Sequence, residues 1–241
     1  MRRSKSKIDV FNKETLKFVQ KFITNKGLRI LEVGCGSGDF AVELMKTGIA
    51  LTALDTDKSA VVSAINKGVP AKHLDFLSFN DAPFDIIIFT RSLHHIHNLK
   101  EALEHSKLLL KKKGKLIIED FDLEEVDLKT SRWYYDTISI LSTIYREDKF
   151  SNDIKDPIKA WKDDHYHEPP LHTGKKMIKN IEENFKIIKI ERNAYLYRSI
   201  CNLVGEHETE YDVTKKILEI EKGLIANRLI LPNGLRIVAE N

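Results

Sequence analysis

The stretch Leu28–Leu44, LRILEVGCGSGDFAVEL, organises the expected fold. An apolar run, Ile30–Val33, leads into three glycines in alternation, Gly34, Gly36 and Gly38. Apolar residues then recur at three- and four-residue spacing, which is typical of a helix. Glycines suit such a turn because a Cβ would obstruct both positive φ values and a ligand pressed against the backbone. The pattern predicts a strand, a tight turn and a helix whose N-terminus faces a ligand.

The acidic residues around this turn narrow the class of ligand. Asp39 stands where a dinucleotide-binding G-x-G-x-x-G turn needs its third glycine. Glu32 precedes the turn, and a carboxylate there repels a pyrophosphate but suits a cationic ligand with a free amine. A second apolar run, Ile49–Leu54, ends at Asp55, an acid placed to accept both hydroxyls of a ribose.

Several segments in the same order resemble class I S-adenosylmethionine-dependent methyltransferases. Glu32–Gly38 resembles their first motif, and Asp55 resembles their ribose-binding acid. Further along the chain, Asp75-Phe76 resembles the pair that binds the adenine, and Phe84–Thr90 resembles the fourth strand. Leu93–Ile96 (LHHI) resembles the segment that follows this strand in small-molecule methyltransferases. Leu108–Glu119 resembles the helix end, glycine and fifth strand. The resemblance covers about Gly27–Asp122 motif by motif.

This resemblance implies an α/β fold with a doubly wound, seven-stranded, mostly parallel sheet. The last strand would run antiparallel, and a helical lid would lie between strands 5 and 6. The implied cofactor is S-adenosylmethionine, with S-adenosylhomocysteine as product. The residues expected to bind the cofactor are Glu32, Gly34, Cys35, Gly36, Gly38, Asp55, Thr56, Asp75, Phe76 and Thr90.

The alternation of strand and helix patterns over Gly27–Asp122 independently predicts a parallel sheet covered on both faces. Helices are expected at Lys58–Lys67 and Leu99–Leu110. Lys111–Lys113 would lie at the C-terminal end of the second helix, where the helix dipole favours cations, and Gly114 would end it. We expect one domain over residues 1–241, with an N-terminal helical segment at 1–26.

The segment 123–182 interrupts the alternation of strands and helices and is expected to be a helical lid that forms the acceptor pocket. Within it, Trp161 and His165 stand four residues apart and would share a helix face; together with His172 they are the candidate acceptor-binding residues. One apolar helix face is formed by Trp133, Tyr134, Ile138, Leu141 and Ile144. A metal site at His165, His167 and His172 is not favoured, because the spacing matches no known ligand pattern. A helix at Asp212–Leu229 and a last strand at Leu235–Ala239 are expected to close the fold.

Histidines are the candidate catalytic bases. Methyl transfer from a sulfonium is an in-line displacement, so proximity supplies much of the catalysis and a base is added where the acceptor loses a proton. His94 and His95 follow the fourth strand, and His165 and His172 from the lid are their rivals. The sequence does not rank them. Asp120 also falls at a strand end, although an acid there is often a turn or capping residue.

The acceptor is expected to be a small molecule. Enzymes that methylate base amino groups resemble one another in an Asn/Asp-Pro-Pro-Tyr segment after the fourth strand, whereas Thr90–Leu93 reads TRSL here. Oxygen, nitrogen and carbon acceptors stay open. The alternatives are a nicotinamide-dependent oxidoreductase, a non-catalytic protein that keeps the cofactor fold, and, from the basic segment Met1–Lys7, a tRNA or protein acceptor.

The composition is that of an ordinary globular protein: 241 residues, 42% hydrophobic and 31% charged, with a net charge of +3. Such a balance gives little support for a nucleic-acid partner. Two cysteines, Cys35 and Cys201, do not make a disulfide framework and favour a reducing compartment. No apolar run approaches the ~20 residues that span a bilayer. We expect a cytoplasmic enzyme without a membrane partner. The sequence does not determine its oligomeric state.

Overall fold

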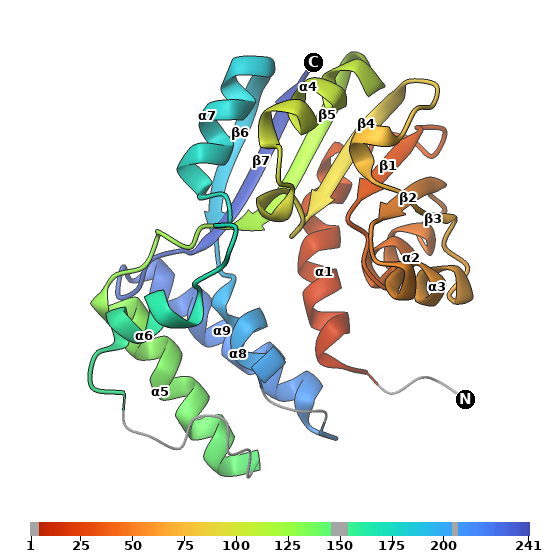
Figure 1. The fold of residues 1–241 in the computed structure, drawn as a ribbon. Helices are drawn as coiled ribbons and strands as arrows, with labels where there is room; N and C mark the ends of the chain where they lie inside the picture. The colour runs from red at the N-terminus through yellow and green to blue at the C-terminus, as the bar shows by residue number, and fades with distance from the viewer. Residues whose placement is uncertain (1–4, 146–153, 204–206) are drawn as a thin grey trace. The chain divides into compact units, whose positions relative to one another are not determined.

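A computed structural model describes residues 5–145, 154–203 and 207–241 (Figure 1). Part of the basic segment Met1–Lys7 therefore lies outside the described residues. Internal contacts divide the chain into two compact units. The sheet unit consists of Asn12–Phe121, Leu171–Glu191 and Leu235–Asn241, and the helical unit of Met1–Phe11, Asp122–Pro170 and Arg192–Gly234. The expectation of a single domain stays a prediction.

A seven-stranded sheet has the strand order β3-β2-β1-β4-β5-β7-β6 (Figure 1). The strands are β1 (Ile30–Val33), β2 (Leu51–Asp55), β3 (Ala71–His73), β4 (Phe84–Thr90), β5 (Leu110–Phe121), β6 (Lys186–Asn193) and β7 (Gly234–Glu240). From β3 to β5 all neighbours pair in parallel. β7 runs antiparallel to β5, because Asn233 bonds Asp122 while Asn241 bonds Gly114. The predicted fold class is confirmed.

Both faces of this sheet are covered, so its central strands are apolar on both sides. All four residues of β1 are buried. Ile30 packs into a core with the end of α1 (Lys7–Val19) and with α2 (Asp39–Met45). Leu31 and Val33 point the other way, into a core with α4 (Leu99–Leu109) and α7 (Gly174–Asn184). Glu32 shares the face of Ile30, so a carboxylate lies inside an otherwise apolar layer.

The remaining elements of the sheet unit are short. α3 (Lys58–Asn66) follows β2, and its N-cap Asp57 accepts backbone hydrogen bonds from Ser59 and Ala60. Three single turns of 3-10 helix complete this unit: η1 (Gln20–Phe22), η2 (Phe76–Ser78) and η3 (Leu93–His95). η2 and η3 follow β3 and β4, at the edge of the sheet where parallel strands end.

The described part of the helical unit contains α5 (Leu128–Tyr145), α6 (Pro157–Asp164), α8 (Leu196–Leu203) and α9 (Glu210–Ala226), together with the start of α1. Its core contains Tyr134, Trp161, Tyr197 and Ile217. Within the described residues, no helix has both the length and the apolar character needed to cross a membrane.

One helix of this unit was not predicted, and its cap explains why. The first backbone N–H groups of α8, from Tyr195, Leu196 and Tyr197, donate to the buried carboxylate of Glu221 on α9. A helix start satisfied by a residue 24 to 26 positions later in the chain leaves no local signal in the sequence.

The expectation for Lys111–Lys113 and Gly114 is wrong. α4 ends at Leu109, and β5 already begins at Leu110, whose backbone is extended (φ −90°, ψ 139°). Leu110 pairs with Phe84 of β4, and the Lys111 ammonium lies 2.9 Å from the Asp85 carboxylate. The lysines therefore lie within β5 rather than at the end of a helix. They occupy an irregular stretch where the register shifts, and the Phe84–Leu110 and Ile86–Lys115 pairs on either side hold the chain in the sheet.

Two further expectations for the segment 123–182 need correction. Ile144, placed on the apolar face of α5, is 64% exposed. α7 lies within this segment, yet it belongs to the sheet unit, where Met177 and Ile181 are fully buried against the sheet. The earlier part of the segment remains a predicted acceptor-pocket lid.

Candidate functional site

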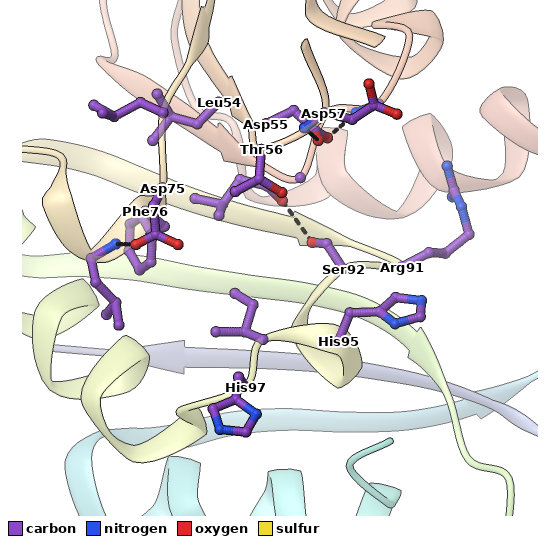
Figure 2. Close-up of a pocket in the computed structure, with 16 residues that line it drawn as sticks. Leu54, Asp55, Thr56, Asp57, Asp75, Phe76, Arg91, Ser92, His95 and His97 are labelled. Atoms are coloured by element: carbon purple, nitrogen blue, oxygen red, sulfur yellow. Dashed lines mark hydrogen bonds between the residues drawn. The ribbon is translucent and has the colours of Figure 1, made fainter. Parts of the chain in front are cut away.

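A cavity of about 770 Å³ lies in the sheet unit at the carboxyl ends of β1, β2, β3 and β4 (Figure 2). This is the edge where open parallel sheets bind ligands. The predicted residues that line it are Gly34, Gly36, Asp55, Thr56, Asp75, Phe76 and His95. Figure 2 shows their labelled side chains approaching the cavity from the loops after β2, β3 and β4.

The glycine turn is shaped by close backbone approach. Gly34 has φ 74°, and a Cβ there would lie 2.3 Å from the Cβ of Ser92. Ser92 Oγ donates to the Val33 carbonyl at 2.6 Å, which fixes the loop after β4 against the turn. Gly38 (φ 75°) caps α2, and its Cβ would meet Ala64 of α3 at 2.8 Å. Gly38 thus packs two helices together and lines neither of the cavities described here.

Asp55 holds the turn and also faces the cavity. Its Oδ2 accepts from the Gly36 N–H at 2.7 Å, and its Oδ1 accepts from the Asp57 N–H at 2.9 Å. Each carboxylate oxygen has two lone pairs, so both can accept a further hydrogen bond from a ligand. The arrangement suits a vicinal diol, which supplies two donors.

Asp75 and Phe76 form the opposite wall of the cavity (Figure 2). Asp75 Oδ1 accepts from the Leu77 N–H at 2.8 Å, so this acid does cap a helical turn, η2. The Phe76 ring is buried and meets Phe89 and His105 edge-on. An apolar wall beside an exposed carboxylate suits a flat heterocycle that carries an amino group.

A second cavity of about 240 Å³ adjoins the first and shares Gly34, Gly36 and Arg91 with it. The predicted residues Glu32, Cys35 and Thr90 line this smaller space.

Glu32 is fully buried in the wall of this smaller cavity. Its Oε1 accepts from Thr90 Oγ1 at 3.0 Å, whereas its Oε2 has no hydrogen-bond partner among the described residues. Burial raises the pKa of Glu32 from 4.5 to about 7, although the bond from Thr90 and the charge of Arg91 oppose the shift. A buried acceptor without a donor fits a ligand ammonium group.

Arg91 is a site residue that the sequence analysis did not single out. Its backbone is left-handed (φ 57°), an uncommon conformation for a long side chain. Within the described part of the chain it supplies the single cationic side chain of the two cavity walls. Its position directly after the fourth strand, at the ligand edge of the sheet, was the available signal.

The two adjacent histidines have different surroundings. His94 is buried, and its Nδ1 lies 2.6 Å from Oδ1 of Asp120. His95 is exposed and lines the larger cavity (Figure 2). The two rings lie 4.0 Å apart between centroids, and His94 itself lines neither of the two cavities.

His172 holds the segment that carries these histidines. Its N–H donates to the His94 carbonyl at 3.0 Å, and its ring Nε2 lies 2.8 Å from the Ile96 carbonyl. Burial lowers the pKa of His172, so the neutral ring is favoured. Contact of His172 with an acceptor stays a prediction.

Trp161 on α6 and His165, the residue directly after this helix, lie side by side in the helical unit. Their rings stack at 3.8 Å between centroids, and the indole N–H of Trp161 donates to the Leu123 carbonyl at 3.0 Å. Trp161 is buried in the core of this unit. His165 and His172 belong to different units. The roles of Trp161 and His165 toward an acceptor stay predictions.

A family profile described as "Methyltransferase domain" matches residues 6–156. A curated relative, a ubiquinone biosynthesis O-methyltransferase of Coxiella burnetii, is 28% identical over 117 residues, which are 45% of this chain and 50% of that protein. The match spans about half the length of such relatives.

Solved structures share the fold at low sequence identity. The [4+2]-cyclase SpnF superposes with a TM-score of 0.62 and 14% identity over 95% of this chain and 81% of its own. The N-methyltransferase NodS of Bradyrhizobium japonicum, solved with S-adenosyl-L-homocysteine, gives a TM-score of 0.54 and 13% identity over 97% and 86%. The profile covers more than half of the sequence, and the expected resemblance is confirmed. The chain belongs to the methyltransferase domain family.

Proposed function

We propose that this protein transfers a methyl group from S-adenosylmethionine to a small-molecule acceptor and releases S-adenosylhomocysteine. One observation carries the proposal: two adjoining cavities meet at the glycine turn, with Asp55 in one wall and the unpartnered Oε2 of Glu32 in the other. A nucleoside joined to an amino acid has the polar groups that this pair of cavities requires.

In the larger cavity, the adenosine part of the cofactor would meet Asp55, Asp75 and Phe76. Asp55 would accept both ribose hydroxyls, since each of its oxygens already positions the turn and retains a lone pair. The Phe76 wall would exclude water from the heterocycle, and Asp75 would accept from its amino group.

In the smaller cavity, the amino-acid part of the cofactor would find two opposite charges. Glu32 would accept from the ammonium group, and Arg91 would face the carboxylate. Arg91 Nη1 lies 3.5 Å from Glu119 Oε2, a long contact that leaves the guanidinium able to turn toward a ligand.

The protein does not need to form a covalent bond to the substrate, because bound S-adenosylmethionine supplies an activated methyl group with a neutral leaving group. This chain would bind the cofactor, align the acceptor and remove a proton where the acceptor carries one. The candidates for the last step remain His94 and His95, with His165 as the alternative. The acceptor atom stays open among oxygen, nitrogen and carbon. A cytoplasmic location is consistent with Cys35 and Cys201, which are both free and buried.

Two alternatives have a specific basis. A neighbour described as a cyclase shares this fold, so the fold alone does not decide the reaction, and binding without methyl transfer is one alternative. A nicotinamide-dependent oxidoreductase is the other; the buried Glu32 opposes it, because that site would repel a pyrophosphate.

Calorimetry with S-adenosylmethionine, S-adenosylhomocysteine and NAD separates these functions. We expect binding of the two adenosyl sulfur compounds and none of NAD. Asp55→Ala should weaken cofactor binding at least tenfold, because a hydrogen bond to a charged group contributes about 1.5–3 kcal/mol and each 1.4 kcal/mol is tenfold. The control is Asp81→Ala, an acid in the loop before β4 that pairs with Arg29 and should leave affinity unchanged. Equal affinity in wild type and Asp55→Ala would remove the ribose assignment.

Turnover is tested with S-adenosylmethionine that carries a deuterated methyl group and an extract of small metabolites. Mass spectrometry should find label in a small-molecule product and S-adenosylhomocysteine in equal amount. Cofactor binding without labelled product would instead support the binding-protein alternative.

A further inference from the structure

A buried histidine–carboxylate pair lies beside the larger cavity and has no role in the cofactor contacts described above. His94 stands in η3 after β4, and Asp120 stands near the end of the neighbouring strand β5. The side chains are 5% and 0% exposed. Polar groups buried this deeply persist only when they satisfy each other or serve a ligand.

The short contact between His94 and Asp120 favours one position for the imidazole proton. Nδ1 of His94 and Oδ1 of Asp120 are 2.6 Å apart, a distance at which two lone pairs would repel each other. The pair lacks the alignment of a hydrogen bond in this structure, yet at this distance a proton on Nδ1 is the arrangement that avoids the repulsion. The lone pair is then on Nε2, which no hydrogen bond between described residues engages.

Asp120 also holds the backbone of the histidine. Its Oδ2 accepts from the His94 N–H at 3.3 Å, and its Oδ1 accepts from the Phe121 N–H at 2.9 Å. From the other side, His172 binds the carbonyls of His94 and Ile96. Both the backbone N–H and the backbone carbonyl of His94 are therefore hydrogen-bonded, which fixes the position of this residue as a catalytic group requires.

This fixed segment borders the cavity. Ser92, His95, Ile96 and His97 line it, and His94 lies among them in the sequence with its ring against that of His95. His94 is thus placed within the loop that borders the expected cofactor position, and Asp120 holds it from the neighbouring strand.

We propose that His94 is the proton acceptor of the reaction, that Asp120 is its positioning residue, and that the acceptor substrate is a hydroxyl compound. The proposal rests on the methyl transfer proposed above.

Nε2 of His94 takes the proton of the acceptor hydroxyl as the oxygen lone pair forms the new O–CH₃ bond. The S–CH₃ bond breaks, its electron pair stays on sulfur, and the sulfonium becomes a neutral thioether. Asp120 stabilises the imidazolium, which then gives its proton to water.

The need for a base favours a hydroxyl over an amine. A neutral amine attacks with a lone pair and loses its surplus proton to water after the transfer. A hydroxyl oxygen is a weak nucleophile until its proton leaves, since even a phenol has a pKa of about 10. A positioned base therefore contributes most, typically 10²–10⁴-fold, when the acceptor is a hydroxyl.

Nitrogen-15 NMR of histidine-labelled protein tests the orientation without any substrate. We expect His94 to show the tautomer with the proton on Nδ1, and Asp120→Asn to shift it toward the other tautomer. Asp85→Asn is the matched control. Like Asp120, Asp85 has one basic side-chain partner, here Lys111, and accepts from a backbone N–H, but it lies at the opposite end of β4, so His94 should not change. A proton on Nε2 in the wild type overturns the proposal.

The deuterated-methyl experiment tests the substrate class. We expect the label on oxygen, with 10²–10⁴-fold slower transfer in His94→Gln and Asp120→Asn and a cofactor affinity within twofold of wild type by calorimetry. Circular dichroism confirms that these variants fold, and Asp85→Asn should retain the wild-type rate. Label on nitrogen or carbon overturns the hydroxyl class.

The remaining outcomes distinguish a failure of the His94 assignment from a failure of the proposed methyl transfer. If His95→Gln abolishes transfer while His94→Gln does not, the base is His95 and the assignment is wrong. If S-adenosylmethionine binds and no label moves, the transferase function fails, and the role of His94 as a base fails with it. If S-adenosylmethionine does not bind, the cofactor assignment itself is wrong.

Discussion

Two glutamates are buried in the same sheet with opposite surroundings. Glu119 on β5 receives two N–H donors from Arg236, at 3.0 and 2.6 Å, and a hydroxyl donor from Thr15. Glu32 on β1 receives the Thr90 hydroxyl on one oxygen and, within the described residues, no hydrogen bond on the other. Both side chains are at most 1% exposed.

The difference separates a structural carboxylate from a ligand-binding one. A buried charge that is fully paired fixes the elements it joins, here β5, β7 and α1. A buried charge that lacks a donor costs stability in the free protein, and that cost is relieved when a cationic ligand arrives. Glu32 therefore has the character of a site that is incomplete without its ligand.

The largest expected effect is on folding, from Arg236→Met. This variant keeps the volume of the side chain and leaves the Glu119 charge buried without its main partner, which should cost about 3–5 kcal/mol. Urea unfolding followed by circular dichroism measures the loss. Arg29→Met is the control, since its exposed pair with Asp81 should contribute less than about 1 kcal/mol. Equal losses in the two variants would contradict the structural role of Glu119.

The next effect is on cofactor binding and its pH dependence, from Glu32→Gln. Because burial raises the Glu32 pKa to about 7, the folded protein holds this proton where the unfolded chain has released it. Stability of the ligand-free protein should therefore fall as pH rises from 4.5 to 7, and Glu32→Gln should remove that part of the fall.

S-adenosylmethionine affinity should change in the opposite direction. It should rise between pH 5.5 and 7.5 as Glu32 ionises, and in Glu32→Gln it should be at least tenfold weaker at pH 7.5 and nearly independent of pH. These values follow from about 1.5–3 kcal/mol for a hydrogen bond to a charged group. Calorimetry at matched ionic strength measures both proteins, and an unchanged pH profile in the variant would exclude Glu32 as the ammonium partner.

The smallest effect on folding is expected from Arg91→Met, which removes a charge that acts on both Glu32 and Glu119. Glu119 keeps Arg236 and Thr15, so the unfolding free energy should change by no more than about 1 kcal/mol. Glu32 loses a favourable charge, so its pKa should rise further. Cofactor binding should weaken because the carboxylate of the ligand loses its cation. A stability loss as large as that of Arg236→Met would mean that Arg91 is structural.

The sequence predicted the cofactor edge of the sheet well because the signals there are local. Glycines that need positive φ, apolar runs that end in acids, and helix periodicity lie within a few residues of one another. The boundaries of β4, predicted at Phe84–Thr90, agree with the structure. Local patterning failed at Lys111–Lys113, where a helix-like run of lysines lies in a strand irregularity between residues that pair with β4.

The sequence by itself determined the family, the order of the strands and helices at the cofactor edge, and the placement of Asp55 beside the glycine turn. These follow from backbone preferences and from the rule that parallel strands end at one edge. Only the tertiary structure decided which acids are satisfied. Glu119 meets Arg236 across 117 residues of chain, and His94 meets Asp120 across 26. Such partners are chosen by the packing of distant strands, which no short stretch of sequence records.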